Sequence, residues 1–481
     1  MMMRDSLPQA TRTYTPRPTP TAPHTRRPWH GLGALIVVAL LSAAMTGCSN
    51  ILSDPTPPTA ASGTTAVPNT TAAQDYNAAQ NFSVNHQCVK AIPLYLSALI
   101  KNSIYVYAYL GLGDCYQSMG ALDLAIQAYD KAVTLDPKDF YPYYQRAGAE
   151  INSGDHGDAT TDLFLALVNA PQQVLTYQSI AARFDTYQDF SDEIQVLGKA
   201  IDLAPENAPL YQQRAKLYLQ IGEVKHAYDD YTTAIQITTN PALRAALYSG
   251  EADVYASQQR FDPDAYGAIY TALALQPGDA NIYLHAGDLY QSNGDYQTAL
   301  STYYDKALTL TRTPLTLEKI HESKGDTYVK MGQLQTALGE YRRASRLIFD
   351  AATQGHLSNK IAGIADTYSS QQQFDLAEQA SVAAIAVQPN NASLYLRAGT
   401  ILATAQRYTA ALARYNQALQ HATLLSDREQ IHEAKGDVYA SLGQTTNARD
   451  EYNQAKRLTQ DPDTLAGLDN KTNALTSAST K

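Results

Sequence analysis

Most of this 481-residue chain alternates apolar and polar positions with the spacing of paired helices. In residues 106–139, two stretches place apolar or small residues at i, i+3, i+4 and i+7, and Gly120 lies between them. The first stretch is Tyr109, Leu112, Gly113 and Tyr116, and the second is Leu122, Ala125, Tyr129 and Ala132. This spacing predicts two amphipathic helices joined by a turn. Pro137 then closes the unit, because proline cannot continue a helix.

The same pattern returns with a period of 34 residues, apart from small insertions before 245, 318, 358 and 429. We predict eleven units, which begin near residues 72, 106, 140, 174, 208, 245, 280, 318, 358, 392 and 429. A late position in the second helix is alanine in every unit: Ala98, Ala132, Ala166, Ala200, Ala234, Ala272, Ala307, Ala344, Ala384, Ala418 and Ala455. This column predicts close helix crossings, where a larger side chain would force the backbones apart.

A second small column lies in the first helix, and an aromatic residue often follows it by one turn. The small residues are Gly113, Gly148, Ala181, Ala215, Ala252, Gly287, Gly325, Ala365, Gly399 and Gly436. With the alanine column and the closing prolines, this pattern is similar to that of tetratricopeptide repeats, over about 390 residues. The resemblance implies an all-α fold, a right-handed α-solenoid of about eleven helix pairs, that binds peptides or proteins on its concave face. Glu193 departs from an otherwise small column and predicts looser packing in the fourth unit.

One string occurs twice: IHESKGDTYVKMGQ at 320–333 and IHEAKGDVYASLGQ at 431–444. The matching continues upstream, where residues 250–284 align with 363–396. We therefore predict that units 6–8 (245–357) and units 9–11 (358–468) are two copies of one block, after units 1–5 (72–244) and before a C-terminal tail (469–481). His321 and His432 are then equivalent positions, and not two ligands of one metal.

The N-terminus has the pattern of an export signal. Five arginines and one acid precede an apolar run at 31–45, which spans only about 22 Å as a helix. The following Met45-Thr46-Gly47-Cys48 resembles a bacterial lipoprotein signal, which implies cleavage after residue 47, lipid on Cys48 and a position on the outer face of a membrane. A plain secretory signal or an uncleaved anchor is the alternative. Residues 48–71 are rich in Pro, Thr and Ala and predict a tether.

Charge and motifs restrict the function. The formal net charge of −10 argues against nucleic acid as a partner. No phosphate-binding loop, GxSxG, HExxH or paired-cysteine motif is present, so we predict no enzyme, no cofactor and no metal site. The metal-like segment NSGDHGD (152–158) falls at a predicted helix-to-helix turn. We expect an envelope scaffold for a protein or peptide; the alternative is a lipoprotein that binds a glycan or wall fragment in a tyrosine-rich groove.

Two sets of residues are candidates for specific roles. An acidic column follows the small residue of the first helix: Asp114, Asp253, Asp288, Asp326, Asp366 and Asp437. In tetratricopeptide folds this position faces the groove, so we expect a basic or polar partner, with Lys216 the basic exception. The alternative is that these acids are an ordinary solvated face. Cys88 and Cys115 lie in neighbouring units of a predicted exported protein and form either a disulfide or two small buried residues.

Overall fold

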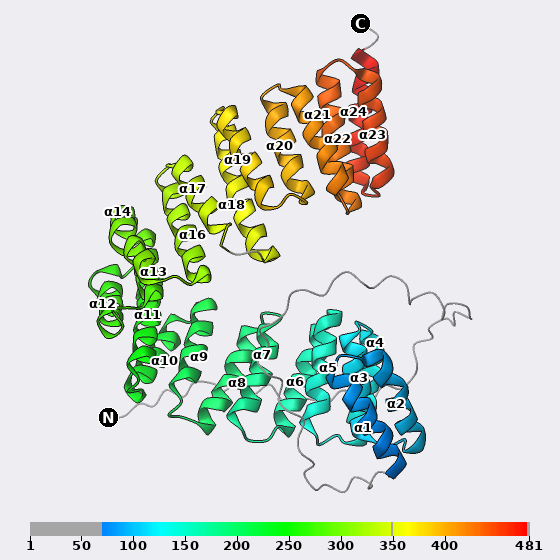
Figure 1. The fold of residues 1–481 in the computed structure, drawn as a ribbon, viewed down its shortest axis with the longest axis vertical. Coiled ribbons are helices and arrows are strands. Elements are labelled where there is room, and N and C mark those ends of the chain that lie inside the picture. The colour runs from blue at the N-terminus through cyan, green and yellow to red at the C-terminus, as the bar shows by residue number, and fades with distance from the viewer. Residues whose placement is uncertain (1–69, 348–349, 479–481) are drawn as a thin grey trace, which may run out of the picture. The chain divides into compact units, whose positions relative to one another are not determined.

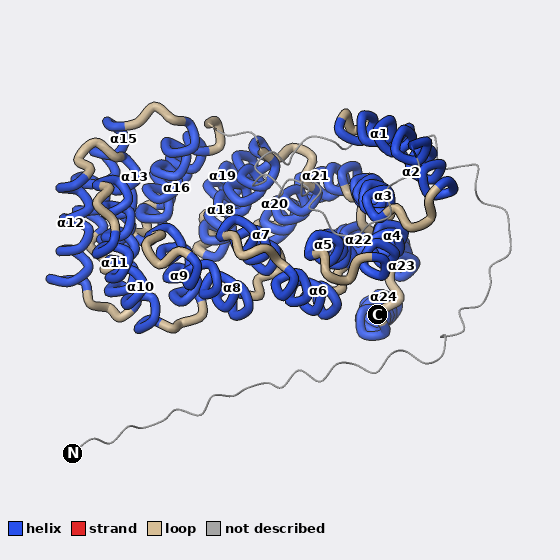
Figure 2. Tube along the Cα trace, turned by 90° about the horizontal axis from the view of Figure 1, so that it is seen from below, coloured by secondary structure: helices blue, strands red, loops and turns tan. Residues whose placement is uncertain are grey.

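The computed structural model describes residues 70–347 and 350–478, and these residues contain helices and no strand (Figures 1 and 2). The first eleven helices are α1 (Thr70–Val84), α2 (Cys88–Lys101), α3 (Val106–Ser118), α4 (Leu122–Leu135), α5 (Phe140–Ser153), α6 (His156–Asn169), α7 (Val174–Asp185), α8 (Phe190–Leu203), α9 (Ala208–Gln220), α10 (Val224–Ile237) and α11 (Pro241–Ser257). The next elements are η1 (Phe261–Ala265), α12 (Tyr266–Leu275), α13 (Ala280–Ser292), α14 (Tyr296–Thr298), η2 (Ala299–Tyr304), α15 (Asp305–Leu310), α16 (Pro314–Lys330) and α17 (Leu334–Ala344). The last are α18 (Ala351–Ser370), α19 (Phe374–Val387), α20 (Ala392–Thr404), α21 (Tyr408–His421), α22 (Leu425–Ser441), α23 (Thr445–Leu458) and α24 (Pro462–Ala478).

Helices that are adjacent in sequence pack as antiparallel pairs, from α1 with α2 to α22 with α23 (Figure 1). In two pairs the second helix contains a π-helical segment, η1 before α12 and η2 between α14 and α15. Each pair also packs against the next, so the core is a series of local clusters along the chain. The predicted all-α solenoid is confirmed.

The alanine column explains why the second helices can approach their neighbours closely. All eleven alanines are buried, with at most 1% of their surface exposed. Glycines of the first helices act in the same way, since a Cβ on Gly113 would lie 2.4 Å from a ring carbon of Tyr129. Gly287, Gly325, Gly399 and Gly436 meet a tyrosine of their partner helix at 2.4 or 2.5 Å in the same manner. A larger residue at these positions would separate the two helices of the pair.

The four predicted insertions lengthen first helices and leave the loops short. Helices α11, α16 and α22 each have 17 residues and α18 has 20, whereas the first helix α9 has 13. The predicted block boundaries at 245 and 358 therefore fall inside helices that begin at Pro241 and Ala351. The added residues extend the start of a helix, so the packing downstream keeps its register.

The predicted C-terminal tail is wrong for residues 469–478, because they form the second half of α24. Leu468 is 1% exposed and packs with Tyr452 of α23. The sequence Leu468, Asn470, Lys471 in α24 matches Leu357, Asn359, Lys360 in α18. Helix α24 thus occupies, after the second block, the place that α18 occupies after the first.

Glu193, for which the sequence predicts looser packing of its unit, is buried between the helices of α7, α8 and α9. Its side chain is only 2% exposed, beside the fully buried Val196 and Leu197. One carboxylate oxygen accepts a hydrogen bond from Gln213 Nε2 at 3.2 Å, and the other has no partner among the described residues. Burial raises the pKa of Glu193 to about 7, since removal from water disfavours the charged form.

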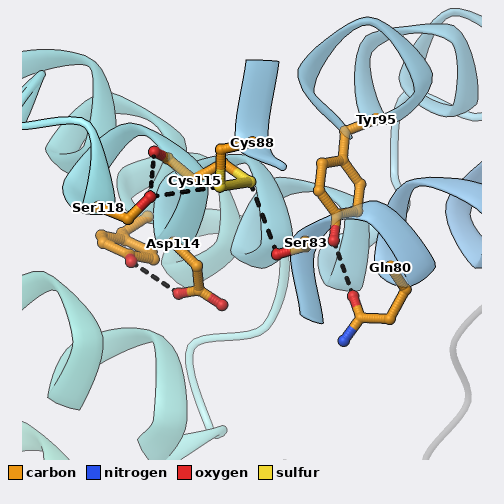
Figure 3. Close-up of a disulfide and its surroundings, with 8 residues drawn as sticks. Gln80, Ser83, Cys88, Tyr95, Asp114, Cys115 and Ser118 are labelled. Carbon is orange, nitrogen blue, oxygen red and sulfur yellow. Dashed lines mark hydrogen bonds between the residues drawn. A yellow bond between two sulfur atoms is a disulfide. The ribbon is translucent and has the colours of Figure 1, made fainter. Parts of the chain in front are cut away.

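A disulfide between Cys88 and Cys115 joins α2 to α3, and hence the first pair to the second (Figure 3). The two Cα atoms are 5.1 Å apart, within the usual range for this bond. Ser118 Oγ lies 3.2 Å from Cys88 Sγ and donates to the carbonyl of Cys115 at 2.8 Å. The bridge is buried in the cluster that unites the first two units.

Candidate functional site

The acidic column is distributed over six first helices: α3, α11, α13, α16, α18 and α22. The carboxylates of Asp253, Asp366 and Asp437 are about half exposed, at 48%, 51% and 48%. The other three are partly buried. The column therefore contains three acids with solvent-exposed side chains and three whose side chains are partly covered by neighbouring residues.

Four of the six acids accept a hydrogen bond from a tyrosine of their partner helix. Tyr129 donates to Asp114 at 2.7 Å, Tyr304 to Asp288 at 2.8 Å, Tyr341 to Asp326 at 2.6 Å and Tyr452 to Asp437 at 2.8 Å. In each case the residue directly before the aspartate is a glycine, and its lack of a side chain leaves space for the tyrosine ring. Burial, with the adjacent carboxylate, raises the pKa of all four hydroxyls, so they remain hydrogen-bond donors.

Sequence reasoning missed this Gly-Asp and Tyr combination, although the pattern is visible in the sequence. Where the small residue is alanine, at Ala252 and Ala365, the partner helix has Ile269 and Ser381 in place of tyrosine. The sequence pattern predicts Tyr129 only as part of the apolar face of its helix. The four tyrosines bonded to the acids are at most 2% exposed, so their rings stabilise the pairs and offer no stacking surface.

The acids also have partners across the unit boundary. Four of them pair with a base on the next first helix: Asp253 with His285 at 2.6 Å, Asp326 with Lys360 at 2.7 Å, Asp437 with Lys471 at 2.7 Å, and Asp366 with Arg397. Asp114 instead accepts from Gln145 of the next first helix at 3.4 Å. The column is consequently not a strip of bare negative charge. Its half-exposed members are offset by bases supplied one unit later.

The bases are themselves held by more than one acid. Lys360 lies 2.6 Å from Glu322 and 2.7 Å from Asp326, and Lys471 lies 2.8 Å from Glu433 and 2.7 Å from Asp437. Burial disfavours the charge of Lys360, but its two carboxylates outweigh burial and raise its pKa. The same cluster of one lysine and two acids thus occurs twice, with its acids in the duplicated strings and its lysine in the following unit.

Surface hollows follow the first helices. The α11/α13 hollow, of about 490 Å³, includes Asp253 and His285. The α18/α20 hollow, of about 530 Å³, includes Asp366 and Arg397, and the α20/α22 hollow, of about 380 Å³, includes Asp437. The last two share Thr400 and Thr404 and are therefore adjacent. Three of the six predicted site residues therefore line a surface hollow.

Other predicted sites have simpler outcomes. Cys48, the signal sequence at 1–47 and nearly all of the tether lie outside the described residues. The described helices include no candidate membrane span. Within the same residues, no group of three His, Cys, Asp or Glu side chains could hold a metal ion. In the segment 152–158, Asp155 caps α6 by accepting from the backbone N–H of Asp158 at 3.2 Å, as in an ordinary helix-to-helix turn.

The fold defines a helical-repeat protein whose first helices line at least three surface hollows among the described residues. Tetratricopeptide-repeat family models match residues 106–139, 249–314, 363–423 and 402–463. These segments are tetratricopeptide repeats, and repeats of this kind form non-catalytic scaffolds for protein interaction.

Known proteins are similar over limited stretches or at low identity. BBSome complex member BBS4 of Bos taurus is 24% identical over 196 residues, which are 41% of this chain and 30% of that protein. The chain thus matches less than a third of the length of this relative. Yeast Tom70 is 16% identical with a TM-score of 0.31, covering 85% of this chain and 96% of that one. The C-terminal part of a repeat protein from Cytophaga hutchinsonii is 14% identical with a TM-score of 0.38, covering 55% and 99%. These two structural similarities are too low to support an inference about function.

Proposed function

We propose that this protein is an exported, lipid-anchored scaffold that holds a peptide or protein partner along the groove of its first helices. The observation that carries the proposal is the succession of hollows on that face, each lined by polar side chains from consecutive first helices. Extended concave surfaces of this kind are what solenoid proteins use for binding. The signal and tether pattern of residues 1–71 supports export and anchoring.

The cross-unit ion pairs bear on the kind of partner. Of the two classes that the acidic column suggested, a polar partner is favoured over a strongly basic one. Asp253, Asp326, Asp366 and Asp437 already have a base within 4 Å, and a basic partner would have to compete with it. Exposed charges that are paired in this way exert little long-range attraction at physiological salt.

The alternative of a glycan or wall fragment has less support from the site. Stacking on sugar rings needs exposed aromatic faces, and the α18/α20 hollow includes no aromatic side chain. Tyr231 and Tyr415, at the α11/α13 and α20/α22 hollows, are 1% and 2% exposed, and Tyr408 of the α20/α22 hollow is partly buried. The groove therefore offers hydrogen bonds more than stacking surfaces.

Crosslinking in native membranes tests the proposal. The full-length protein with a C-terminal affinity tag would be crosslinked in its own cells, purified from the membrane fraction and digested for mass spectrometry. We expect crosslinks from a partner protein to first-helix residues of the groove. A small molecule that raises the melting temperature of the purified protein, in the absence of any crosslinked protein, would instead establish the alternative.

A further inference from the structure

The outer face of α2, in the first helix pair of the array, carries a stripe of exposed apolar side chains (Figure 1). Val89, Pro93, Leu96 and Ile100 follow one another at i, i+4, i+7 and i+11, so they lie on one face of the helix. Val89 is 73% exposed, Leu96 42% and Ile100 87%, and Pro93 is exposed as well. Ile104, just after the helix, is 52% exposed and extends the stripe. The opposite face of α2 is buried against α1 and α3.

This stripe is not part of the repeat pattern. Aligned on the alanine column, other second helices carry polar side chains at the four positions. They are Asp123, Gln127, Asp130 and Thr134 in α4, Lys225, Asp229, Thr232 and Gln236 in α10, and Thr446, Asp450, Asn453 and Arg457 in α23. Among the described second helices, only α2 has Val, Leu, Ile or Pro at all four. Packing of the solenoid therefore does not explain the stripe, and a contiguous exposed apolar surface marks an interaction site.

The charges around the stripe are few and mostly basic. In residues 70–113, the only Asp, Glu, Lys or Arg side chains are those of Asp75, Lys90 and Lys101. Lys101 lies 2.5 Å from Asp75 and offsets its charge. Lys90 donates to Gln87 Oε1 at 3.1 Å and has no carboxylate within 4 Å among the described residues. At 100° per residue, both lysines fall on the same flank of the stripe.

An apolar face with lysines along its flank matches a lipid surface. Such a face enters the boundary between headgroups and acyl chains, while the lysine stems lie along the apolar region and their ammonium groups stay with the phosphates. A second copy of the chain fits less well. The 14 residues of α2 make a helix about 21 Å long and about 10 Å wide, far below the roughly 800 Å² per partner of a stable protein interface.

The position of α2 in the chain favours the same occupant. Residues 49–69 separate Cys48, the predicted lipid attachment site, from the start of α1 at Thr70. A chain of this length spans about 25 Å as a coil and about 70 Å when extended. Helix α1, with 15 residues, adds about 22 Å, so the stripe is within reach of the membrane. Tethering raises the local concentration of the lipid surface, so a weak contact is sufficient.

We propose that the outer face of α2 docks on the surface of the membrane that anchors the chain, with Val89, Leu96 and Ile100 inserted at the headgroup boundary. The inference rests on the proposed lipid anchor and adds a second, non-covalent contact. The first helix pair then lies against the membrane, and the later pairs extend from it.

Tryptophan fluorescence on vesicles tests the proposal with the full-length chain. A polyhistidine tag inserted after Asn50 holds the chain on vesicles of phosphatidylcholine, phosphatidylglycerol and a nickel-chelating lipid, whether or not Cys48 is modified. The probe is Ile100→Trp, and the matched control is Thr134→Trp, at the exposed equivalent position of α4. Trp29, the single tryptophan of the sequence, is common to all variants, so each is compared with the tagged wild type.

We expect lipids with a doxyl group on the acyl chain to quench Ile100→Trp and shift its emission to the blue, and to leave Thr134→Trp unchanged. Adding Val89→Asp and Leu96→Asp to Ile100→Trp introduces the residue types of α4 at two exposed positions. This variant should keep its helical circular dichroism and lose the quenching.

Three results overturn the proposal. They are no quenching of Ile100→Trp on vesicles that retain the chain, equal quenching of Thr134→Trp, and quenching that survives the two aspartates. A blue shift of Ile100→Trp that depends on protein concentration without vesicles, and that the aspartates abolish, would assign the face to a second copy instead.

The outcome can be separated from that of the lipid anchor, because the tag replaces the anchor. If mass spectrometry of the native protein finds no lipid on Cys48 and Ile100→Trp is quenched, the docking face stands and the proposed anchor fails. If Cys48 carries lipid and Ile100→Trp is not quenched, the anchor stands and α2 does not contact the membrane.

Discussion

Lys360 Nζ donates to both carboxylate oxygens of Asp326 at 2.7 Å, across the boundary between α16 and α18. Lys471 makes the same pair of contacts with Asp437, across the boundary between α22 and α24. In both cases the lysine comes from the unit after the acid, so the charge of the groove depends on neighbouring units. This relationship, together with the packing of the pairs, leads to five predictions.

Removing these lysines should expose the acids without unfolding the solenoid. We expect Lys360→Gln and Lys471→Gln to lower the free energy of unfolding by at most about 1 kcal/mol each, because partly exposed ion pairs contribute little. The double variant should bind a fluorescent Lys-rich peptide more tightly than the wild type at low salt, and the gain should vanish at high salt. Equal binding at low salt would show that the acids do not govern the groove potential.

The contact of Gly325 with Tyr341 should be sensitive to one methyl group. A Cβ at residue 325 would lie 2.5 Å from Tyr341 Cε1, so Gly325→Ala should lower the free energy of unfolding by about 1–3 kcal/mol. The control is Gly339→Ala in α17, where nothing lies within 4 Å of the new Cβ. That change should raise stability by about 0.5–1 kcal/mol. Urea denaturation measures both, and equal effects would contradict the tight contact.

Glu193 should make the protein less stable as the pH rises. Its folded pKa, about 7, lies above the ordinary value of 4.5, so the folded state favours the protonated form. The contribution is fully present below pH 4.5 and is lost as the pH rises through about 7, by up to about 3 kcal/mol.

Glu193→Gln should remove this part of the pH dependence, because the amide is neutral throughout. Thermal denaturation between pH 4.5 and 8 measures it. The exposed Glu206 provides the matched control, since Glu206→Gln should leave the profile unchanged. Parallel profiles for wild type and Glu193→Gln would contradict the assignment.

The disulfide should stabilise the first two units. Its cysteines are separated by 27 residues in the sequence, and a disulfide that closes a loop of this length adds about 3 kcal/mol to the free energy of unfolding. We expect Cys88→Ser with Cys115→Ser to lower the melting temperature by an amount similar to that caused by reducing the wild type. Thiol titration of the unfolded, unreduced protein should find neither cysteine free, and two free thiols would exclude the bridge.

Processing at Cys48 remains a prediction of the sequence. We expect the mature chain to begin at Cys48, to carry lipid and to fractionate with membranes, because the apolar run at 31–45 is short for a permanent span. Mass spectrometry of the native protein checks this. An intact N-terminus, or a Cys48→Ser protein that matures and stays membrane-bound unchanged, would exclude lipidation.

The sequence by itself determined the repeating helix pairs and the duplication, because both are encoded locally. The spacing of Leu122, Ala125, Tyr129 and Ala132 fixes one apolar face of a helix wherever that helix lies, and the alanine column requires close crossings in every unit. The sequence gives less where residues far apart in sequence meet. The hydrogen bond from Gln213 to the buried Glu193, 20 residues away, depends on the packing of α9 against α8.

Only the tertiary structure decided the character of the site. The sequence placed Asp326 and Asp437 in one acidic column, but it did not show that a tyrosine of the partner helix and a lysine of the next unit would reach each of them. Pairing of charges depends on how the helices stack, since residues 34 positions apart become neighbours only when one pair packs on the next. Periodicity therefore specified which face carried the acids, and packing between units decided which of those acids have a base beside them.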